Sequence, residues 1–123
     1  MNGHHADAPV LLFTLGGRRF AAPAVDVRRV ARRGDAPFAG GTALGAPRDG
    51  SRGLVVRCGD GEAALAIDEV HGMLTGARLH RLPALVAHLL PRGGIAGLVE
   101  HEDELLPLLD LPVLLRDRAE DRG

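Results

Sequence analysis

The stretch GLVVRCGDGEAALAIDEVHGM, residues 53–73, is the pattern on which the rest of the chain is built. Residues 54–56 are apolar and two of them are β-branched, which favours a β-strand. The segment CGDG that follows is typical of a turn, because glycine adopts positive φ without steric cost. Residues 63–67 form the returning strand. Asp68 comes next, where its carboxylate can accept bonds from nearby backbone N–H groups. The stretch therefore predicts a hairpin that ends in a capped turn.

The same pattern occurs once before and once after this stretch. The upstream copy is VLLFTLGGRRFAAPAVDVRRV (10–30), and the downstream copy is IAGLVEHEDELLPLLDLPVLL (95–115). In each copy an Asp follows an apolar residue, and Asp26, Asp68 and Asp110 are 42 residues apart each time. Propeller blades have about this length, but the chain has no Trp, and three units cannot close a propeller of at least about four blades. We therefore predict a mainly β protein in which three hairpins wrap into small barrels.

Short helices are expected beside two of these hairpins. The segment PALVAHLL (83–90) begins with proline and places its apolar residues on one face. The segment that follows Asp110 has proline in its first turn, which predicts a second helix near 111–118. The segment AVDVRRV (24–30) fits either a helical turn or a further strand.

Three segments are not expected to belong to the folded core. Residues 1–9 are predicted to be a disordered lead and residues 117–123 a frayed tail. Residues 31–52 hold five glycines, two prolines and few large apolar side chains. Such a segment cannot offset the entropy of ordering, which is about 1–2 kcal/mol per residue. We predict that it is a flexible loop and a site of rapid proteolysis.

Composition excludes several classes of function. A chain of 123 residues is the length of one domain. The net charge is −1 and the only aromatic residues are three Phe, so neither a basic field nor a stacking platform for nucleic acid is expected. A single cysteine excludes an internal disulfide and fits a reducing compartment. No apolar run reaches the roughly 20 residues that span a bilayer, and the N-terminus lacks a signal-type core. We expect a cytoplasmic protein with no direct membrane insertion.

Catalytic chemistry has few candidates in this sequence. The three aspartates are interpreted as turn and helix caps rather than acid–base groups. Cys58 lies in a glycine-rich turn with no flanking His, so we interpret it as an exposed thiol rather than a nucleophile. The histidines do not have metal-ligand spacing, and no glycine loop precedes a helix in a phosphate-binding form. We expect no enzyme activity, no cofactor and no bound metal.

Taken in order, the three copies resemble the CheW-like coupling proteins of bacterial chemosensory arrays. LLFTLGGRRFAAPAVDVRRV looks like that family's opening strand, glycine turn, returning strand and V-x-x-V turn. AALAIDEVHGM looks like its L-x-V-D-x-V-x-G segment, and GIAGLVEHEDELLPLLDLPVLL looks like its closing hairpin, P-L-L-D and helix. The resemblance covers about residues 10–116. It implies a fold of two small SH3-like β-barrels.

The chain departs from the family between the first and second hairpins. The family carries there a glycine-started strand, an N-x-R-G turn and a P-V-x-D-L strand, whereas this chain has the segment 31–52. Arg52-Gly53 matches the R-G pair in letters but leads directly into the strand at 54–56. The chain therefore resembles a shortened copy without the middle strand pair, with one barrel incomplete. This departure puts in doubt the partner contacts that use the missing strands.

The resemblance also implies a function and a binding surface. Coupling proteins are non-enzymatic adaptors that tie the cytoplasmic tip of a chemoreceptor to the regulatory domain of a CheA-type histidine kinase. Their partner enters the groove between the two barrels, beside the first hairpin and the turn after it. The matching positions here are Val25, Val27, Arg28, Arg29 and Val30. The alternative is a small β-barrel enzyme or ligand-binding domain unrelated to chemotaxis. An open apolar cavity with convergent polar groups would favour that alternative, and a filled barrel would favour the adaptor.

Overall fold

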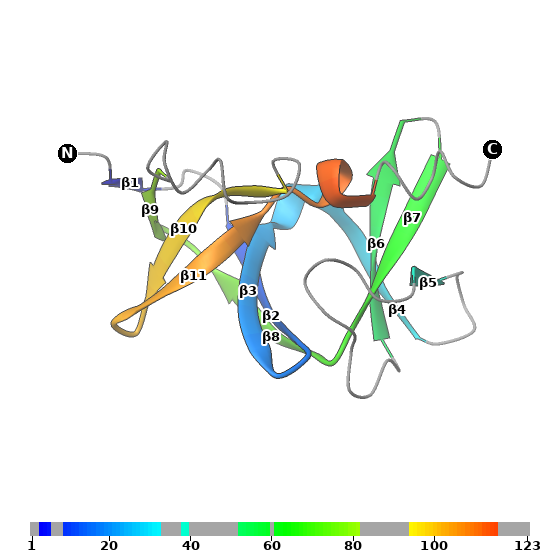
Figure 1. The fold of residues 1–123 in the computed structure, drawn as a ribbon, viewed down its shortest axis with the longest axis horizontal. Helices are drawn as coiled ribbons and strands as arrows, with labels where there is room; N and C mark the ends of the chain where they lie inside the picture. Colours follow the sequence, from blue (N-terminus) through cyan, green and yellow to red (C-terminus); the bar gives the residue numbers. More distant parts are fainter. Residues whose placement is uncertain are drawn as a thin grey trace.

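The strands of the protein form two sheets that lie beside each other (Figure 1). The computed structural model describes residues 3–5, 9–32, 38–39, 52–59, 61–81 and 94–115. One sheet has seven strands in the order β1-β9-β10-β11-β3-β2-β8, and the other has four in the order β4-β6-β7-β5. The strands of the first sheet are β1 (Gly3–His5), β9 (Arg78–His80), β10 (Ile95–His101), β11 (Glu104–Leu109), β3 (Arg18–Pro23), β2 (Val10–Leu15) and β8 (Glu69–Leu74). Those of the second are β4 (Val27–Arg32), β6 (Arg52–Cys58), β7 (Gly61–Ile67) and β5 (Phe38–Ala39).

All three predicted hairpins are present, and the prediction of a mainly β fold is confirmed. They are the antiparallel pairs β2–β3, β6–β7 and β10–β11. The first turn uses Gly16 and Gly17, with φ of 64° and 82°. These left-handed values suit the right-handed twist of a two-residue hairpin and favour glycine.

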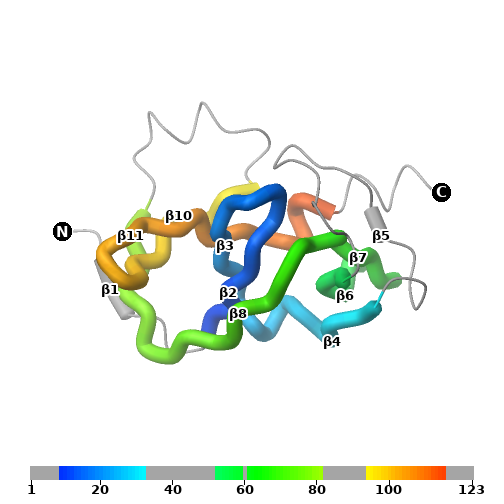
Figure 2. The backbone as a smooth tube through the Cα atoms, turned by 90° about the horizontal axis from the view of Figure 1, so that it is seen from below, coloured from blue at the N-terminus to red at the C-terminus, as the bar shows by residue number. Residues whose placement is uncertain are grey.

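The seven-stranded sheet is strongly curled, as the view in Figure 2 shows. Its first and last hairpins meet where β3 runs parallel to β11, with Ala21 opposite Leu108. Among the described strands, the edges of neither sheet pair with each other, so both are open sheets. The curl still gives the seven-stranded sheet an inner face that apolar side chains can fill.

Strands β2, β3 and β11 form a wall that is apolar on both faces. Alternate residues of β2 point to opposite sides, as the period of two in a strand requires. Phe13 and Leu15 join the main core between the two sheets, whereas Val10 joins a second core inside the curl. Burying a side chain such as that of Phe13 contributes about 1.5–3 kcal/mol. This two-sided burial explains why the sequence at β2 is an apolar run rather than an alternating one.

The remaining buried residues also divide among separate apolar clusters. The main core also takes side chains from β3, β6, β7, β11 and the segment after β11, namely Phe20, Ala22, Leu54, Val56, Leu65, Ile67, Leu109, Leu111 and Leu115. The second core adds Ala21, Ala77, Val99 and Leu108, with Leu12, Leu74 and Leu79 packed against it. A third, small cluster lies on the other face of the four-stranded sheet and contains Ala31, Val55 and Ala64.

A short helix follows β11 at residues 111–115 and closes the main core. Leu111 and Leu115 are one helical turn apart and are both fully buried. The predicted second helix is confirmed over these residues, and its continuation to 118 lies outside the described part. The helix predicted at 83–90 also lies outside the described residues.

The segments predicted to lie outside the core are only partly described. Gly3–His5, inside the predicted lead, pairs with β9. Within 31–52 the described residues belong to strands: β4 ends at Arg32, β5 pairs in parallel with β7, and β6 starts at Arg52. Residues 33–37, 40–51 and 116–123 lie outside the described part, so the flexible loop, the missing strand pair and the frayed tail remain predictions.

Candidate functional site

Strand β4 and the turn before it carry the five residues that the resemblance assigns to partner binding. The chain leaves β3, makes one 3₁₀ turn (η1, Ala24–Asp26) and enters β4, so it passes here from the first sheet to the second. The segment 24–30 is therefore both a helical turn and a strand. The pairing of β4 with β6 shifts between Val27 and Arg29, which makes Arg28 an extra residue in the strand.

The three valines of this segment have different surroundings. Val25, in η1, is 80% exposed, and Val30, in β4, is 44% exposed. Val27 is half-buried and packs against the main core. The structure thus leaves two of the three valines available to a partner, while the third contributes to the fold.

The two arginines between these valines share one carboxylate. Arg28 Nε lies 3.5 Å from Glu62 Oε2, and Arg29 Nη1 lies 3.7 Å from Glu62 Oε1. The extra residue in β4 lets two consecutive side chains reach the same group on β7. All three side chains are about half exposed, so these pairs contribute little to stability. They hold a net positive group between two exposed valines.

The cap predicted for Asp110 is confirmed, and the cap predicted for Asp26 is wrong. Asp110 Oδ1 accepts a bond from the N–H of Val113 at 3.2 Å, and the Asp110 carbonyl accepts the N–H of Leu114 at 3.0 Å. Asp26 is instead the last residue of η1, and Pro23 is the residue at the N-cap position. Partial burial, and then the nearby Asp110 carboxylate, raise the pKa of Asp26 above its usual value.

Asp68 connects the central hairpin to the first one. Its Oδ2 accepts a bond from the N–H of Gly17 at 3.3 Å, and its own N–H donates to the carbonyl of Thr14 at 2.9 Å. The three equally spaced aspartates therefore have three different environments.

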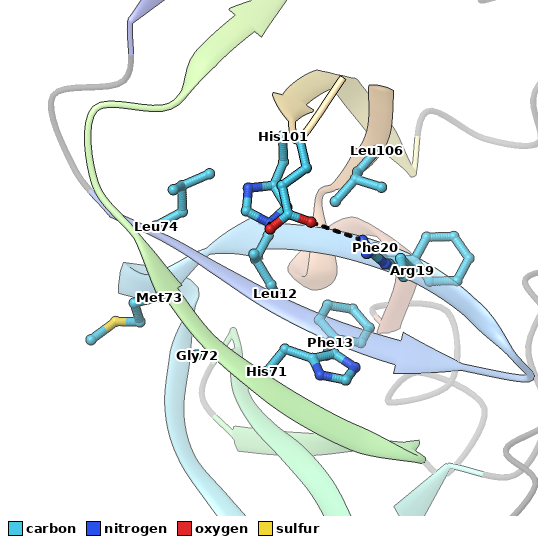
Figure 3. A pocket seen from close by; sticks show the side chains of 11 residues that line it. Leu12, Phe13, Arg19, Phe20, His71, Gly72, Met73, Leu74, His101 and Leu106 are labelled. Atoms are coloured by element: carbon cyan, nitrogen blue, oxygen red, sulfur yellow. Dashed lines mark ion pairs between the residues drawn. The ribbon is translucent and has the colours of Figure 1, made fainter. Parts of the chain in front are cut away.

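A hollow of about 360 Å³ opens at one end of the curled sheet, and the residues around it come from strands β2, β3, β8, β10 and β11 and from the β10–β11 turn (Figure 3). Phe13 and Phe20 lie opposite each other in β2 and β3, with ring centroids 6.0 Å apart. Leu106 and Leu12 add further apolar surface. The remaining lining is Arg19, His71, Gly72, Met73, Leu74, His101 and Glu102. The hollow therefore combines apolar walls with several polar groups.

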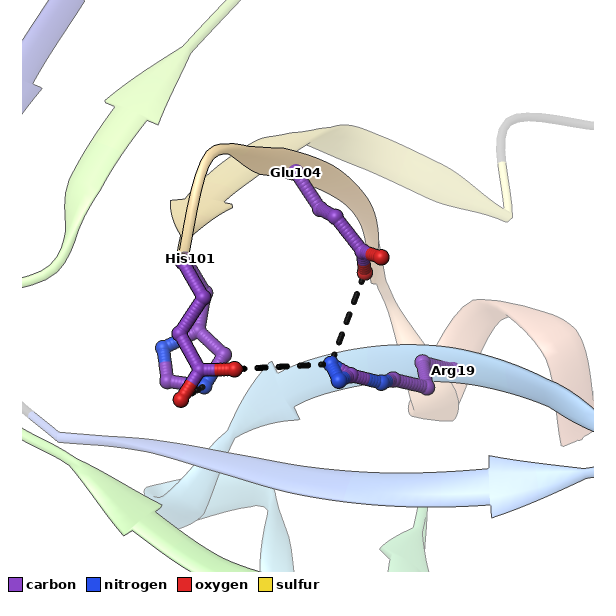
Figure 4. Close-up of polar contacts among 4 residues, drawn as sticks. Arg19, His101 and Glu104 are labelled. Carbon is purple, nitrogen blue, oxygen red and sulfur yellow. Dashed lines mark ion pairs between the residues drawn. The ribbon is translucent and has the colours of Figure 1, made fainter.

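Ion pairs connect the two hairpins at the rim of this hollow (Figure 4). Arg19 Nη1 lies 3.4 Å from Glu104 Oε2 and 3.9 Å from Glu102 Oε2. His101 Nε2 lies 3.8 Å from Glu102 Oε1. Glu102 and Asp103 form the β10–β11 turn with φ of 49° and 64°, values that are uncommon for residues other than glycine. The rim thus contains a turn of two acidic residues in left-handed conformation, and Arg19 faces the carboxylates of Glu102 in this turn and of Glu104 at the start of β11.

The thiol of Cys58 and possible metal-ligating side chains are the other candidate groups. Cys58 is half-buried and packs against the main core, so the prediction of an exposed thiol is wrong. Burial raises the pKa of the Cys58 thiol, which keeps it protonated and weakly nucleophilic. The described residues contain no group of three or more side chains that could hold a metal ion. Among those same residues, no helix has the length and apolar character needed to cross a membrane.

Comparison with solved structures shows what this fold is similar to. The scaffolding protein TtCheW from Thermoanaerobacter tengcongensis matches with a TM-score of 0.65. The match covers 89% of this chain and 93% of that chain, at 14% sequence identity. No protein-family model matches the sequence, and no curated protein matches it either. The CheW-like fold is therefore supported by structure alone.

The sequence singled out the β4 segment as a candidate surface and gave no indication of the hollow. Arg19 and Phe20 were visible only as part of a returning strand, and His71 and His101 only as histidines without metal spacing. One signal was present in the third hairpin, where two acidic residues occupy a tight turn that usually takes Asn or Gly. Residues 71–74 of β8 line the hollow because β8 pairs with β2, and no local sequence pattern predicts that pairing.

Proposed function

We propose that the protein is a non-enzymatic adaptor of bacterial chemosensory signalling. In this role it ties the cytoplasmic tip of a chemoreceptor to the regulatory domain of a CheA-type histidine kinase. The observation that carries the proposal is the pair of exposed valines, Val25 and Val30, at the passage between two sheets in a fold that matches a scaffolding protein. A large apolar side chain that the core does not use is suited to a protein interface.

Two further features support binding at this place. Strand β4 pairs with β6 on one side, and no other described strand pairs with its second edge. Such an edge offers backbone donors and acceptors to a partner. Arg28 and Arg29 provide a charged rim beside the valines, which speeds encounter with an acidic surface and makes it salt-dependent. Each contact is small, and repetition in an array would multiply the binding.

A direct titration tests the proposal. The full chain is titrated with the chemoreceptor tip and with the kinase regulatory domain from the same genome, and binding to at least one is expected. The variant Val25→Glu should abolish or strongly weaken it, because a carboxylate would then have to be desolvated in an apolar contact. Leu105→Glu is the matched control, since Leu105 is also exposed but lies on β11.

Two results would contradict the proposal. Binding to neither protein at about 100 μM, with an intact fold, would argue against the adaptor function. Equal loss of binding in Val25→Glu and Leu105→Glu would show that the β4 segment is not the interface. The predicted absence of the middle strand pair makes it essential to measure the two partners separately, because one contact can persist without the other.

A further inference from the structure

Strand β4 forms the outer edge of the four-stranded sheet, with β6 on its other side (Figure 2). Its regular pairing with β6 begins at Arg29, after the extra residue Arg28. Within the described part of the chain, no strand pairs with the second edge of β4. An edge of this kind presents backbone N–H and C=O groups that a further strand can bind.

One row of apolar side chains crosses this sheet and ends at the free edge. Val30 pairs with Leu54, and Leu54 pairs with Leu65, so these three side chains lie on one face of the sheet. Leu54 and Leu65 are 0% and 1% exposed and belong to the main core, whereas Val30 is 44% exposed. A strand added beside β4 would place one residue opposite Val30. An apolar side chain at that position would continue the row and cover Val30.

The strands of this sheet carry an excess of positive charge, although the whole chain has a net charge of −1. Together β4, β6 and β7 contain five arginines and a single acidic residue, Glu62. The side chains of Arg28 and Arg29 already share the carboxylate of Glu62. Arg57 stands opposite Glu62 in the β6–β7 ladder. Three arginines thus lie around one carboxylate, and a further carboxylate would be attracted to them.

These charges decide which occupant the edge favours. A second copy of β4 would bring arginines against arginines, and like charges directly opposite each other destabilise a strand pair. A strand that carries carboxylates would instead complement Arg28 and Arg29. Successive residues of a strand point to opposite faces, so the residue opposite Arg29 and the residue opposite Val30 lie on different faces. The complementary segment therefore alternates acidic and apolar residues.

We propose that β4 receives an extended segment of a partner protein as a further strand, with an apolar side chain against Val30 and a carboxylate beside Arg28 and Arg29. The inference rests on the proposed function, because it uses the same surface, and it adds the binding mode and the chemistry of the partner segment. In strand addition, main-chain hydrogen bonds supply affinity and alternate side chains supply specificity. Glu62 then competes with the partner for the two arginines, through contacts that are half exposed and therefore weak.

The test uses short peptides of one length and different charge. The peptide acetyl-TEVEVT-amide alternates acidic and apolar residues, and acetyl-TKVKVT-amide reverses the charge. Each peptide is titrated into the full chain, and two-dimensional amide NMR spectra follow Arg29, Val30 and Ala31. We expect saturable shifts with the acidic peptide at about millimolar concentration. The basic peptide should bind about tenfold more weakly at low salt, and the difference should shrink as the salt concentration rises.

N-methylated peptides test whether binding uses the backbone. Two versions of the acidic peptide carry N-methyl groups on alternate residues, in opposite phases, so each version has one edge without N–H groups. Alternate N–H groups of a strand point to opposite edges, so only one of the two versions should retain binding. Binding of both versions as tightly as the parent peptide, or loss of binding in both, would overturn strand addition.

Two variants should change the affinity for the acidic peptide in opposite directions. Arg29→Gln should weaken binding about threefold, the difference expected for one exposed charge pair. Glu62→Gln should tighten binding by about the same factor, because Arg28 and Arg29 lose their internal partner. A purely structural role of these ion pairs predicts no such tightening. Arg18→Gln is the matched control, since Arg18 is also exposed but lies on β3, and it should bind as the unmodified protein does.

Three other results would overturn the proposal. The first is the absence of saturable shifts at Arg29, Val30 and Ala31 with the acidic peptide up to about 10 mM. The second is equal shifts with pyrophosphate, which has charge but no backbone. The third is a set of shifts at these residues that grows with protein concentration alone, which would assign the edge to a second copy of the chain.

The peptide titrations involve neither the chemoreceptor nor the kinase, so they fail separately from the proposed function. Failure of the peptides together with intact binding to either protein would overturn strand addition alone. Peptide binding without binding to either protein would support strand addition and contradict the adaptor function.

Discussion

Truncating the valines of η1 and β4 should show which of them contribute to partner affinity and which to the free energy of unfolding. Val→Ala removes two methyl groups, and each buried carbon of this kind contributes about 0.8 kcal/mol. Val25 is 80% exposed, so a partner would bury nearly all of that surface, and Val25→Ala should cost about 1–1.5 kcal/mol of binding, roughly a tenfold rise in Kd. Val30 is 44% exposed, so Val30→Ala should cost about half as much, roughly a threefold rise.

The third valine supplies the internal control. Val27 packs against the main core, so Val27→Ala should lower the free energy of unfolding by about 1 kcal/mol. Val25→Ala and Val30→Ala should leave unfolding unchanged within about 0.5 kcal/mol. The assays are calorimetric titration with each partner and urea unfolding of the same three variants. The reasoning is refuted if Val25→Ala binds as the unmodified protein does, or if Val25→Ala lowers stability more than Val27→Ala.

Three further predictions concern the fold itself. Asp110→Ala should lower stability by about 1 kcal/mol in a thermal or urea melt, because the N–H of Val113 loses its acceptor, whereas Asp110→Asn should retain the cap and stay close to the parent protein. The pKa of Asp26 is raised in the folded state, so its ionisation opposes folding: stability should fall as pH rises through the raised pKa, and Asp26→Asn should abolish that fall, as unfolding curves between pH 4 and 7 would reveal. Gly72→Ala should cost about 1–3 kcal/mol through its positive φ, while Gly61→Ala, which also has open space around it but no positive φ, should cost less in the same urea titration.

The hairpins could be predicted from sequence because each depends on local signals. Two apolar runs separated by a tight polar turn give a hairpin wherever they occur, and residues 53–67 do so as predicted. The cap at Asp110 was predictable for the same reason, since its acceptor and donor are three residues apart. Asp68 shows the limit of such reasoning, because its carboxylate bonds the N–H of Gly17, 51 residues away.

The two candidate surfaces depend on β-bulges, which the alternation of apolar and polar residues along a strand does not reveal. The extra residue Arg28 in β4 changes the alternation, so the pattern could not tell which valines face the core. The extra residue His71 in β8 does the same at the hollow. The hollow also needs β8 beside β2 and β11 beside β3, and these neighbours are set by packing of the whole chain. Both surfaces therefore appear only once the sheets are assembled.

The parallel contact between β3 and β11 sets the order in which the molecule can fold. The β2–β3 and β6–β7 hairpins are local and can form early, but Ala21 finds its partner only at Leu108, near the far end of the described chain. Until then β3 has one unpaired edge, and the apolar side chains of the wall are open to solvent. Contacts of such long sequence separation slow folding and prolong exposure to aggregation. During synthesis, the first hairpin must therefore wait for the last before the wall between the two cores is complete.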